Sequence, residues 1–383
     1  VKVKGLGERI VPIVPDEART FGMEGMFRQL GIYSNVGQLY EPEDRGQVMY
    51  YREDVKGQIL EQGINEAGAM SVWIAASTAY SMHNQPMIPF YAFYSMFGFQ
   101  RIGDLAWAAG DSQARGFLIG ATAGRTTLNG EGLQHADGHS HVLASTIPNC
   151  VSYDPTYGYE LAVIVHDGLR RMYKNKENVF YYITTMNENY VHPAMPAGAE
   201  EGIIRGLYML KEAPSSTAKI VQLIGSGAIL LEVEAAAELL QEVFGIRANV
   251  WSATGMNELR KEAMEAQRWN MLHPLDEPQV PWVTQQLRGT RGPVVAASDY
   301  MKIHSEQIRA FLPGRTYYTL GTDGFGRSDS REKLRHHFEV DRYFIVIAAL
   351  NALADDGEIG RSVVEDAIRR FDINPEKPYA PKV

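Results

Sequence analysis

The stretch KIVQLIGSGAILLEVEAAAELLQEV, residues 219–243, decides the fold class. Its first part is an apolar run that ends in Gly225–Gly227, and its second part carries apolar residues at helical spacing. A buried strand, a glycine turn and an amphipathic helix form the repeating unit of a parallel sheet. The same alternation returns at 248–269 and at 293–312. Residues 219–383 are therefore predicted to form a doubly wound α/β domain.

Residues 1–212 show the same kind of pattern ahead of this stretch. GFLIGATAG, residues 116–124, is a buried run that ends in a glycine turn, and Tyr159–Tyr173 has one apolar helical face. APSSTA, residues 213–218, is small and rich in Pro and Ser, which is typical of a linker. We therefore expect two consecutive doubly wound α/β domains, at 1–212 and at 219–383.

The glycines at Gly225–Gly227 follow a predicted strand and open a predicted helix, as they do in dinucleotide-binding proteins. Leu230 stands where the third glycine of that fingerprint belongs, and no acidic residue ends the next strand, at Val250–Trp251. A tight turn between strand and helix is therefore the favoured interpretation.

The composition is that of an ordinary globular protein and argues against several classes. Of 383 residues, 45% are hydrophobic and 22% are charged, and the net charge of -9 disfavours a nucleic-acid partner. The single cysteine, Cys150, excludes an intrachain disulfide, and the ten histidines show no metal-ligand spacing. No apolar run reaches the roughly 20 residues that span a bilayer, so no membrane partner is expected. The sequence begins without Met, which indicates a processed chain or a piece of a longer one.

Glu66 is the first candidate site residue. It lies in GINEAGAM, residues 63–70, at the predicted start of a helix of small residues. A carboxylate there stabilises a helix simply by its charge near the N-terminus. From the residues alone, this structural interpretation is the favoured one.

A second candidate is NGEGLQHADGHSH, residues 129–141, which places Glu131 and His135 between glycines. Glycines let a backbone approach a ligand closely, and histidine exchanges protons near neutral pH. A catalytic loop and a hydrogen-bonded structural loop are equally consistent with this composition.

Longer segments carry a specific resemblance that covers essentially the whole chain. The segments are RIVPIVPDEARTFGMEGMFRQLGIY (9–33), MIPFYAFYSMFGFQRIGDLAWAAGD (87–111), RTTLNGEGLQHADGHSH (125–141), RWNMLHPL (268–275) and LGTDGFGRSDSREKLRHHFEV (320–340). With them, the sequence closely resembles the decarboxylating component of pyruvate dehydrogenase complexes, of the homodimeric bacterial type. The resemblance implies a transketolase-like arrangement, with a pyrimidine-binding domain for thiamine diphosphate at 1–212 and a transketolase C-terminal domain at 219–383.

The resemblance also implies residue roles around the cofactor. Glu66 matches the glutamate that hydrogen-bonds the ring nitrogen of the aminopyrimidine and promotes proton exchange. Phe97 matches the aromatic residue that stacks on that ring, and Tyr94 beside it lines the pocket. Arg101 is expected to support the pocket or an interface rather than to contact the substrate.

Three further residues match the substrate side of such sites. His135 and Glu131 match catalytic residues that face the reacting carbon, and His135 and Tyr94 line the substrate pocket. Asp16 matches a substrate-pocket residue that is contributed from the other subunit of the dimer.

One departure from the family pattern concerns magnesium. The family holds magnesium and the diphosphate with a GDG motif followed by Asn, and this sequence has only GDL at Gly103 and GDS at Gly110. We expect these ligands in an N-terminal domain that this chain lacks, so that the chain is about half an enzyme. The same two-domain content occurs in β subunits of the heterotetrameric class, although the motifs match the homodimeric one.

The implied function is oxidative decarboxylation of pyruvate with reductive acetylation of the lipoyl group of the acetyltransferase component, between glycolysis and acetyl-CoA synthesis. A bacterial cytoplasmic homodimer that binds the acetyltransferase and its lipoyl domain is expected. Two alternatives stay open: the same chemistry on a related 2-oxo acid, and a dimerisation and docking module without activity of its own.

Overall fold

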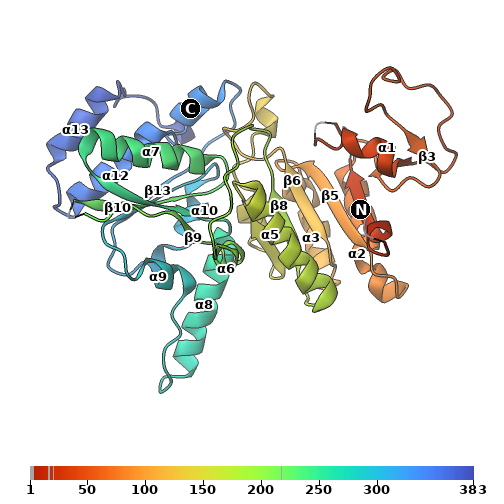
Figure 1. Ribbon diagram of the computed structural model, residues 1–383, viewed down its shortest axis with the longest axis horizontal. Helices are drawn as coiled ribbons and strands as arrows, with labels where there is room; N and C mark the ends of the chain where they lie inside the picture. Colours follow the sequence, from red (N-terminus) through yellow and green to blue (C-terminus); the bar gives the residue numbers. More distant parts are fainter. Residues whose placement is uncertain (1–3, 16–17, 20, 217) are drawn as a thin grey trace. The chain divides into compact units, whose positions relative to one another are not determined.

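The computed structural model describes residues 4–15, 18–19, 21–216 and 218–383 (Figure 1). The chain divides into two compact units. The first holds the residues up to Thr122 together with Leu143–Val151 and Gly168–Thr185. The second holds Ala123–Val142, Ser152–Asp167 and Met186–Val383. Each unit has its own sheet, so the predicted fold class is confirmed.

The sheet of the first unit has six strands in the order β4-β1-β5-β6-β8-β7. The strand pairs β4-β1, β1-β5, β5-β6 and β6-β8 are all parallel. The strands are β1 (Ile10–Val14), β4 (Leu60–Glu61), β5 (Ile88–Tyr94), β6 (Phe117–Ala121), β7 (Cys150–Tyr153) and β8 (Phe180–Thr184), and the small two-stranded sheet beside them has β2 (Ile32–Tyr33) and β3 (Glu53–Asp54). The helices are α1 (Phe27–Leu30), α2 (Glu66–Met82), α3 (Gly98–Asp111) and α4 (Ser140–Ala144).

Helices α2 and α3 pack against β5 and its neighbours because their small residues allow a close approach. The indole of Trp73 in α2 is fully buried and donates to the Phe117 carbonyl oxygen at 3.1 Å. A Cβ atom on Gly98, at the start of α3, would lie 2.1 Å from the Phe93 ring. Both helices are thereby fixed on the same sheet, which matters because each carries a candidate site residue.

The sheet of the second unit has five strands in the order β13-β12-β10-β11-β9. All neighbours are parallel except β9, which runs antiparallel to β11. The strands are β9 (Tyr208–Lys211), β10 (Ile220–Gly225), β11 (Arg247–Ser252), β12 (Val294–Ala297) and β13 (Tyr317–Leu320). Strand β9 precedes the predicted linker at 213–218, so the second sheet begins before that linker.

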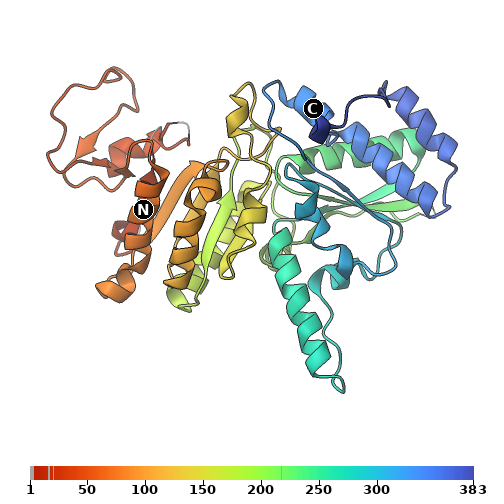
Figure 2. The ribbon, with the colours of Figure 1, turned by 180° about the vertical axis from the view of Figure 1, so that it is seen from behind.

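Helices cover both faces of this sheet (Figure 2). One apolar cluster joins β10 to α7 (Ile229–Phe244), α12 (Arg342–Asp355) and α13 (Arg361–Arg370), and another joins it to α8 (Met256–Leu272) and α9 (Trp282–Leu287). The remaining helices are α5 (Gly158–Leu169), α6 (Glu200–Arg205), α10 (Lys302–Glu306) and α11 (Arg331–His337). Helix α10 covers only part of the helical half of the alternation predicted at 293–312, because the chain tightens into a 3₁₀ turn at Arg309–Phe311.

The glycines at Gly225–Gly227 form a tight turn between β10 and α7, as the sequence indicated. Gly227 has a φ of +51°, and a Cβ atom on it would lie 2.6 Å from a carboxylate oxygen of Asp154. The close approach of a protein side chain explains why glycine is needed here. Within the residues that the structure describes, no helix is both long and apolar enough to cross a bilayer.

Candidate active site

Glu66 begins α2, and the residue before it caps the helix. The Asn65 side-chain oxygen accepts a hydrogen bond from the Gly68 amide at 2.9 Å, which satisfies one of the free donors of the first turn. The Glu66 side chain is 11% exposed, and its Oε1 accepts a bond from Arg101 Nη1 in α3 at 2.7 Å. The carboxylate is thus buried and held at the positive end of a helix.

An aromatic group adjoins this ion pair. The Arg101 guanidinium lies 4.1 Å from the centre of the Phe97 ring, in cation–π contact. Phe97 in turn makes an edge contact with Tyr94 at 6.2 Å between ring centres. Glu66, Arg101, Phe97 and Tyr94 therefore form one continuous cluster within the first unit.

The cluster fits a planar nitrogen heterocycle. Glu66 offers a carboxylate to a ring nitrogen, and Phe97 offers an aromatic face for stacking. Arg101 contacts both groups and so belongs to the cluster itself, while the supporting role expected for it stays a prediction. Sequence reasoning brought these residues to one region but gave no signal for the link that Arg101 makes.

Glu131 and His135 lie together in the second unit, on a loop with a 3₁₀ turn at Leu133–His135. The Glu131 Oε2 atom is 3.7 Å from His135 Nδ1, and the two side chains are 31% and 23% exposed. A half-buried acid and imidazole at this separation can pass or share a proton with a bound molecule.

Three of the polar residues that follow them, Asp137, Ser140 and His141, are buried, and His139 is partly buried. Asp137 accepts hydrogen bonds from the backbone amides of His139 and Ser140, both at 2.9 Å. Burial lowers the pKa values of His139 and of His141 from the usual histidine value, and His304 adds to the effect on His141. Within the motif at 129–141, the structure thus separates a more deeply buried polar framework from the half-buried pair Glu131 and His135.

Residues 326–329, distant in the sequence, contact the loop that carries Glu131 and His135. The Gly130 amide donates to the Asp329 carbonyl oxygen at 3.2 Å, and the Ser328 hydroxyl donates to the Glu131 carbonyl oxygen at 2.5 Å. A Cβ atom on Gly326 would lie 2.5 Å from the Leu133 carbonyl oxygen. The sequence contained 320–340 only as a segment of family resemblance, with no local signal for this contact.

Asp16, the remaining predicted pocket residue, lies outside the described residues. In the part of the chain that is described, no group of three or more His, Cys, Asp or Glu side chains is arranged to hold a metal ion.

Fold and cluster together define a transketolase-like α/β protein. Residues 1–193 match the family described as the pyruvate dehydrogenase E1 component middle domain, and residues 206–341 match the transketolase-like TK C-terminal domain. The chain belongs to the pyruvate dehydrogenase E1 component family, and the resemblance found in the sequence is confirmed.

Curated relatives agree with this assignment. The pyruvate dehydrogenase E1 component of Pseudomonas aeruginosa is 69% identical over 98% of this chain, and that of Escherichia coli K12 is 62% identical over 98% of it. The chain spans 43% and 42% of the lengths of these relatives, which is less than half.

Solved structures share the fold at low identity. Transketolase from Campylobacter jejuni is 17% identical with a TM-score of 0.65, over 90% of this chain and 44% of that one. Transketolase from Leishmania mexicana is 15% identical with a TM-score of 0.66, over 91% of this chain and 43% of that one. A split-gene transketolase matches over 90% of this chain and 92% of its own, with 17% identity and a TM-score of 0.58.

Proposed function

We propose that the full-length protein decarboxylates pyruvate oxidatively with thiamine diphosphate and transfers the acetyl group to the lipoyl group of an acetyltransferase component. The observation that carries the proposal is the cluster of Glu66, Arg101, Phe97 and Tyr94, in a chain of the pyruvate dehydrogenase E1 family. A buried carboxylate beside an aromatic face supplies what an aminopyrimidine ring needs. The name of the relatives supports pyruvate as the substrate.

Glu66 would act first, on the cofactor. When bound, thiamine diphosphate supplies a carbanion for attack on a carbonyl group and then accepts the electron pair that decarboxylation leaves behind. Glu66 would hold and exchange a proton at the ring nitrogen of the aminopyrimidine, while Phe97 and Tyr94 orient that ring. Arg101 holds the carboxylate against α3 and keeps it directed toward the cluster.

Glu131 and His135 would act on the substrate. The Glu131 carboxylate, 3.7 Å from the ring nitrogen, orients the imidazole. His135 would then stabilise a negative oxygen of the substrate, or give a proton to the dithiolane of the lipoyl group. Asp16 is proposed to complete this pocket across a homodimer.

The diphosphate and magnesium would be bound elsewhere in the full-length protein. The described residues offer no acidic or histidine cluster for magnesium, and this chain spans 43% of the length of its Pseudomonas relative. We propose that the remaining length supplies those ligands, and that the complete enzyme is a cytoplasmic homodimer that binds the acetyltransferase component and its lipoyl domain.

Carbon dioxide release by the purified full-length protein tests the proposal. With pyruvate, thiamine diphosphate and magnesium, we expect release that stops when the cofactor is omitted. A parallel series with longer 2-oxo acids should give lower kcat/KM values than pyruvate. Absence of release with every acid, alongside intact binding of the acetyltransferase component, would favour the docking-module alternative.

A further inference from the structure

We propose that Asp299 and Arg331 are positioning residues for Glu131 and His135. They hold the start of the loop at residues 124–138, here called the glycine loop, through Thr126 and Thr127. The inference rests on the proposed function, because it assigns a purpose to the placement of Glu131 and His135.

Asp299 lies two residues after the carboxyl end of β12 in the second sheet and is 3% exposed. Its Oδ1 accepts hydrogen bonds from the Thr126 amide at 2.9 Å and the Thr126 hydroxyl at 2.7 Å. Its Oδ2 accepts one from the Thr127 hydroxyl at 2.7 Å. These three bonds all come from the glycine loop. Burying a carboxylate costs free energy, and here the compensating bonds fix the geometry of one loop.

At Gly124, the loop backbone packs closely against the Asp299 carboxylate. That residue has a φ of +95°, and a Cβ atom on it would lie 2.2 Å from Asp299 Oδ2. Any side chain would have to displace either the loop or the carboxylate. The first residue of the glycine loop and the Asp299 carboxylate are therefore complementary in shape.

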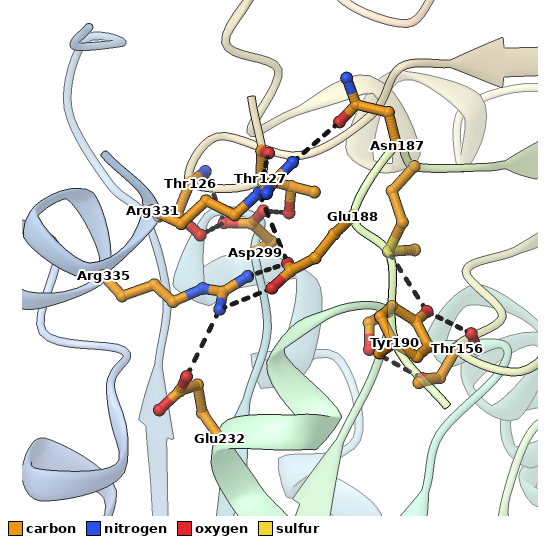
Figure 3. A network of polar contacts seen from close by, with 12 residues as sticks. Thr126, Thr127, Thr156, Asn187, Glu188, Tyr190, Glu232, Asp299, Arg331 and Arg335 are labelled. Carbon is orange, nitrogen blue, oxygen red and sulfur yellow. Dashed lines mark hydrogen bonds and ion pairs between the residues drawn. The ribbon is translucent and has the colours of Figure 1, made fainter. Parts of the chain in front are cut away.

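Arg331, the first residue of α11, binds Thr127 from the other side (Figure 3). Its Nε donates to the Thr127 carbonyl oxygen at 2.7 Å, and its Nη2 donates to Asn187 Oδ1 at 3.3 Å. Thr127 is thus held at its hydroxyl by Asp299 and at its carbonyl by Arg331. Because both its side chain and its backbone are hydrogen-bonded, Thr127 has a fixed position.

The helix that carries Arg331 is itself anchored by ion pairs (Figure 3). Arg335, one turn further along α11, pairs with Glu188, and its Nη1 lies 3.4 Å from Glu232 Oε1 in α7. Arg342 at the start of α12 donates its Nε to the other oxygen of Glu232 at 2.9 Å. Arg331 is therefore presented to the loop from a rigid base.

From Thr127 the chain reaches Glu131 in four peptide steps, a span of at most about 14 Å. A shift at Thr127 should be passed along the backbone to Glu131, where the neighbouring bonds run from the Gly130 amide to the Asp329 carbonyl oxygen and from the Ser328 hydroxyl to the Glu131 carbonyl oxygen. Loss of the Asp299 or Arg331 contacts should accordingly misplace the Glu131–His135 pair while leaving the sheet intact.

The test uses Asp299→Asn in the full-length protein, with Asp341→Asn as the matched control. Asp341 is also a buried carboxylate of the second unit, but it accepts bonds from the Tyr343 and Phe344 amides at the start of α12. Hydrogen–deuterium exchange should become at least about tenfold faster for amides of residues 124–138 in Asp299→Asn and stay unchanged there in Asp341→Asn. Unchanged exchange of the loop in Asp299→Asn would overturn the inference without reference to any activity.

A double-mutant comparison then separates positioning from general stability. Asp299→Asn should lower kcat for carbon dioxide release about tenfold or more in the wild-type background. It should lower it less than about twofold when Glu131→Gln and His135→Ala are already present, because nothing remains to be positioned. Equal losses in both backgrounds would overturn the inference.

Arg331 offers a second variant. Arg331→Lys keeps a donor within reach of the Thr127 carbonyl and should retain more activity than Arg331→Leu.

Failure of the proposed function would be seen separately. It fails if the wild-type protein releases no carbon dioxide, or if the Glu131→Gln/His135→Ala variant releases it as fast as the wild type. The exchange experiment then still decides whether Asp299 holds the loop.

Discussion

Glu131 and His135 occupy a turn that the local sequence describes only in part. The glycines around them predicted a loop that approaches a ligand, and the structure does place the two side chains 3.7 Å apart and half-buried. What the sequence could not indicate is how the loop is held. Asp299 and Arg331 lie far along the chain, and a carboxylate at the end of a strand has no local feature that names its partner.

His135→Ala in the full-length protein should spare hydrogen exchange at the thiazolium carbon of the cofactor and impair steps after pyruvate binds. The imidazole is proposed to act on substrate and lipoyl group, whereas Glu66 acts on the cofactor. Acetyl transfer to a lipoyl domain should therefore fall further than decarboxylation with an artificial electron acceptor. Equal losses in both assays, with slowed thiazolium exchange, would place His135 in cofactor activation or in loop structure.

Elements with strong patterns were predictable, and elements defined by distant partners were not. Strands such as β10 and β12 are buried on both faces, so they appear as continuous apolar runs before helices. Strand β9 is a short edge strand whose second-sheet pairing depends on β11, some 40 residues later, and nothing in YMLK indicates it. The cofactor-side cluster was located through family resemblance, and its link through Arg101 came only from the structure.

Helix α10 gives a prediction about pH. His304 in this helix is 2% exposed, and burial lowers its pKa to about 4. His141 lies 5.2 Å away between ring centres, Tyr300 lies 5.4 Å away, and Asp137 is the acidic group that opposes the shift. In the unfolded chain, the pKa of His304 is about 6.5, so the unfolded state takes up a proton at a higher pH than the folded state does. The stability that the neutral ring provides above pH 6.5 is therefore lost as the pH falls toward 4.

His304→Phe should flatten this loss. Between pH 7 and pH 5, His304 alone should reduce the free energy of unfolding by about 2 kcal/mol, and the phenylalanine variant should lose that much less. Urea unfolding at the two pH values measures the difference, and replacement of the exposed His83 serves as the control. An identical pH dependence in wild type and His304→Phe would show that the ring is not neutral in the folded state.

At the scale of the whole molecule, the chain contains two α/β units, and its sequence has no GDG motif, the motif expected from the family resemblance to hold magnesium and diphosphate. Among the described residues, no group of three or more His, Cys, Asp or Glu side chains is arranged to hold a metal ion. The cofactor site proposed for this chain is therefore the pyrimidine side alone.

The isolated chain should bind thiamine diphosphate only weakly. The diphosphate and its magnesium ion are expected to supply much of the binding free energy, and the described residues hold no group of three or more His, Cys, Asp or Glu side chains for that ion. Titration calorimetry should give no measurable heat at micromolar protein, with or without magnesium, whereas the full-length protein should bind. Micromolar, magnesium-dependent binding by the chain alone would contradict this division of the site.

The central claim is that Glu66 exchanges a proton with the bound cofactor, and turnover of Glu66→Gln in the full-length protein tests it most directly. Glutamine keeps the shape of the side chain and its contact with Arg101 but cannot exchange a proton. We predict normal folding, judged by an unchanged melting temperature, and a turnover number lower by about 10²–10⁴-fold. A folded Glu66→Gln protein with turnover within about twofold of wild type would contradict the claim.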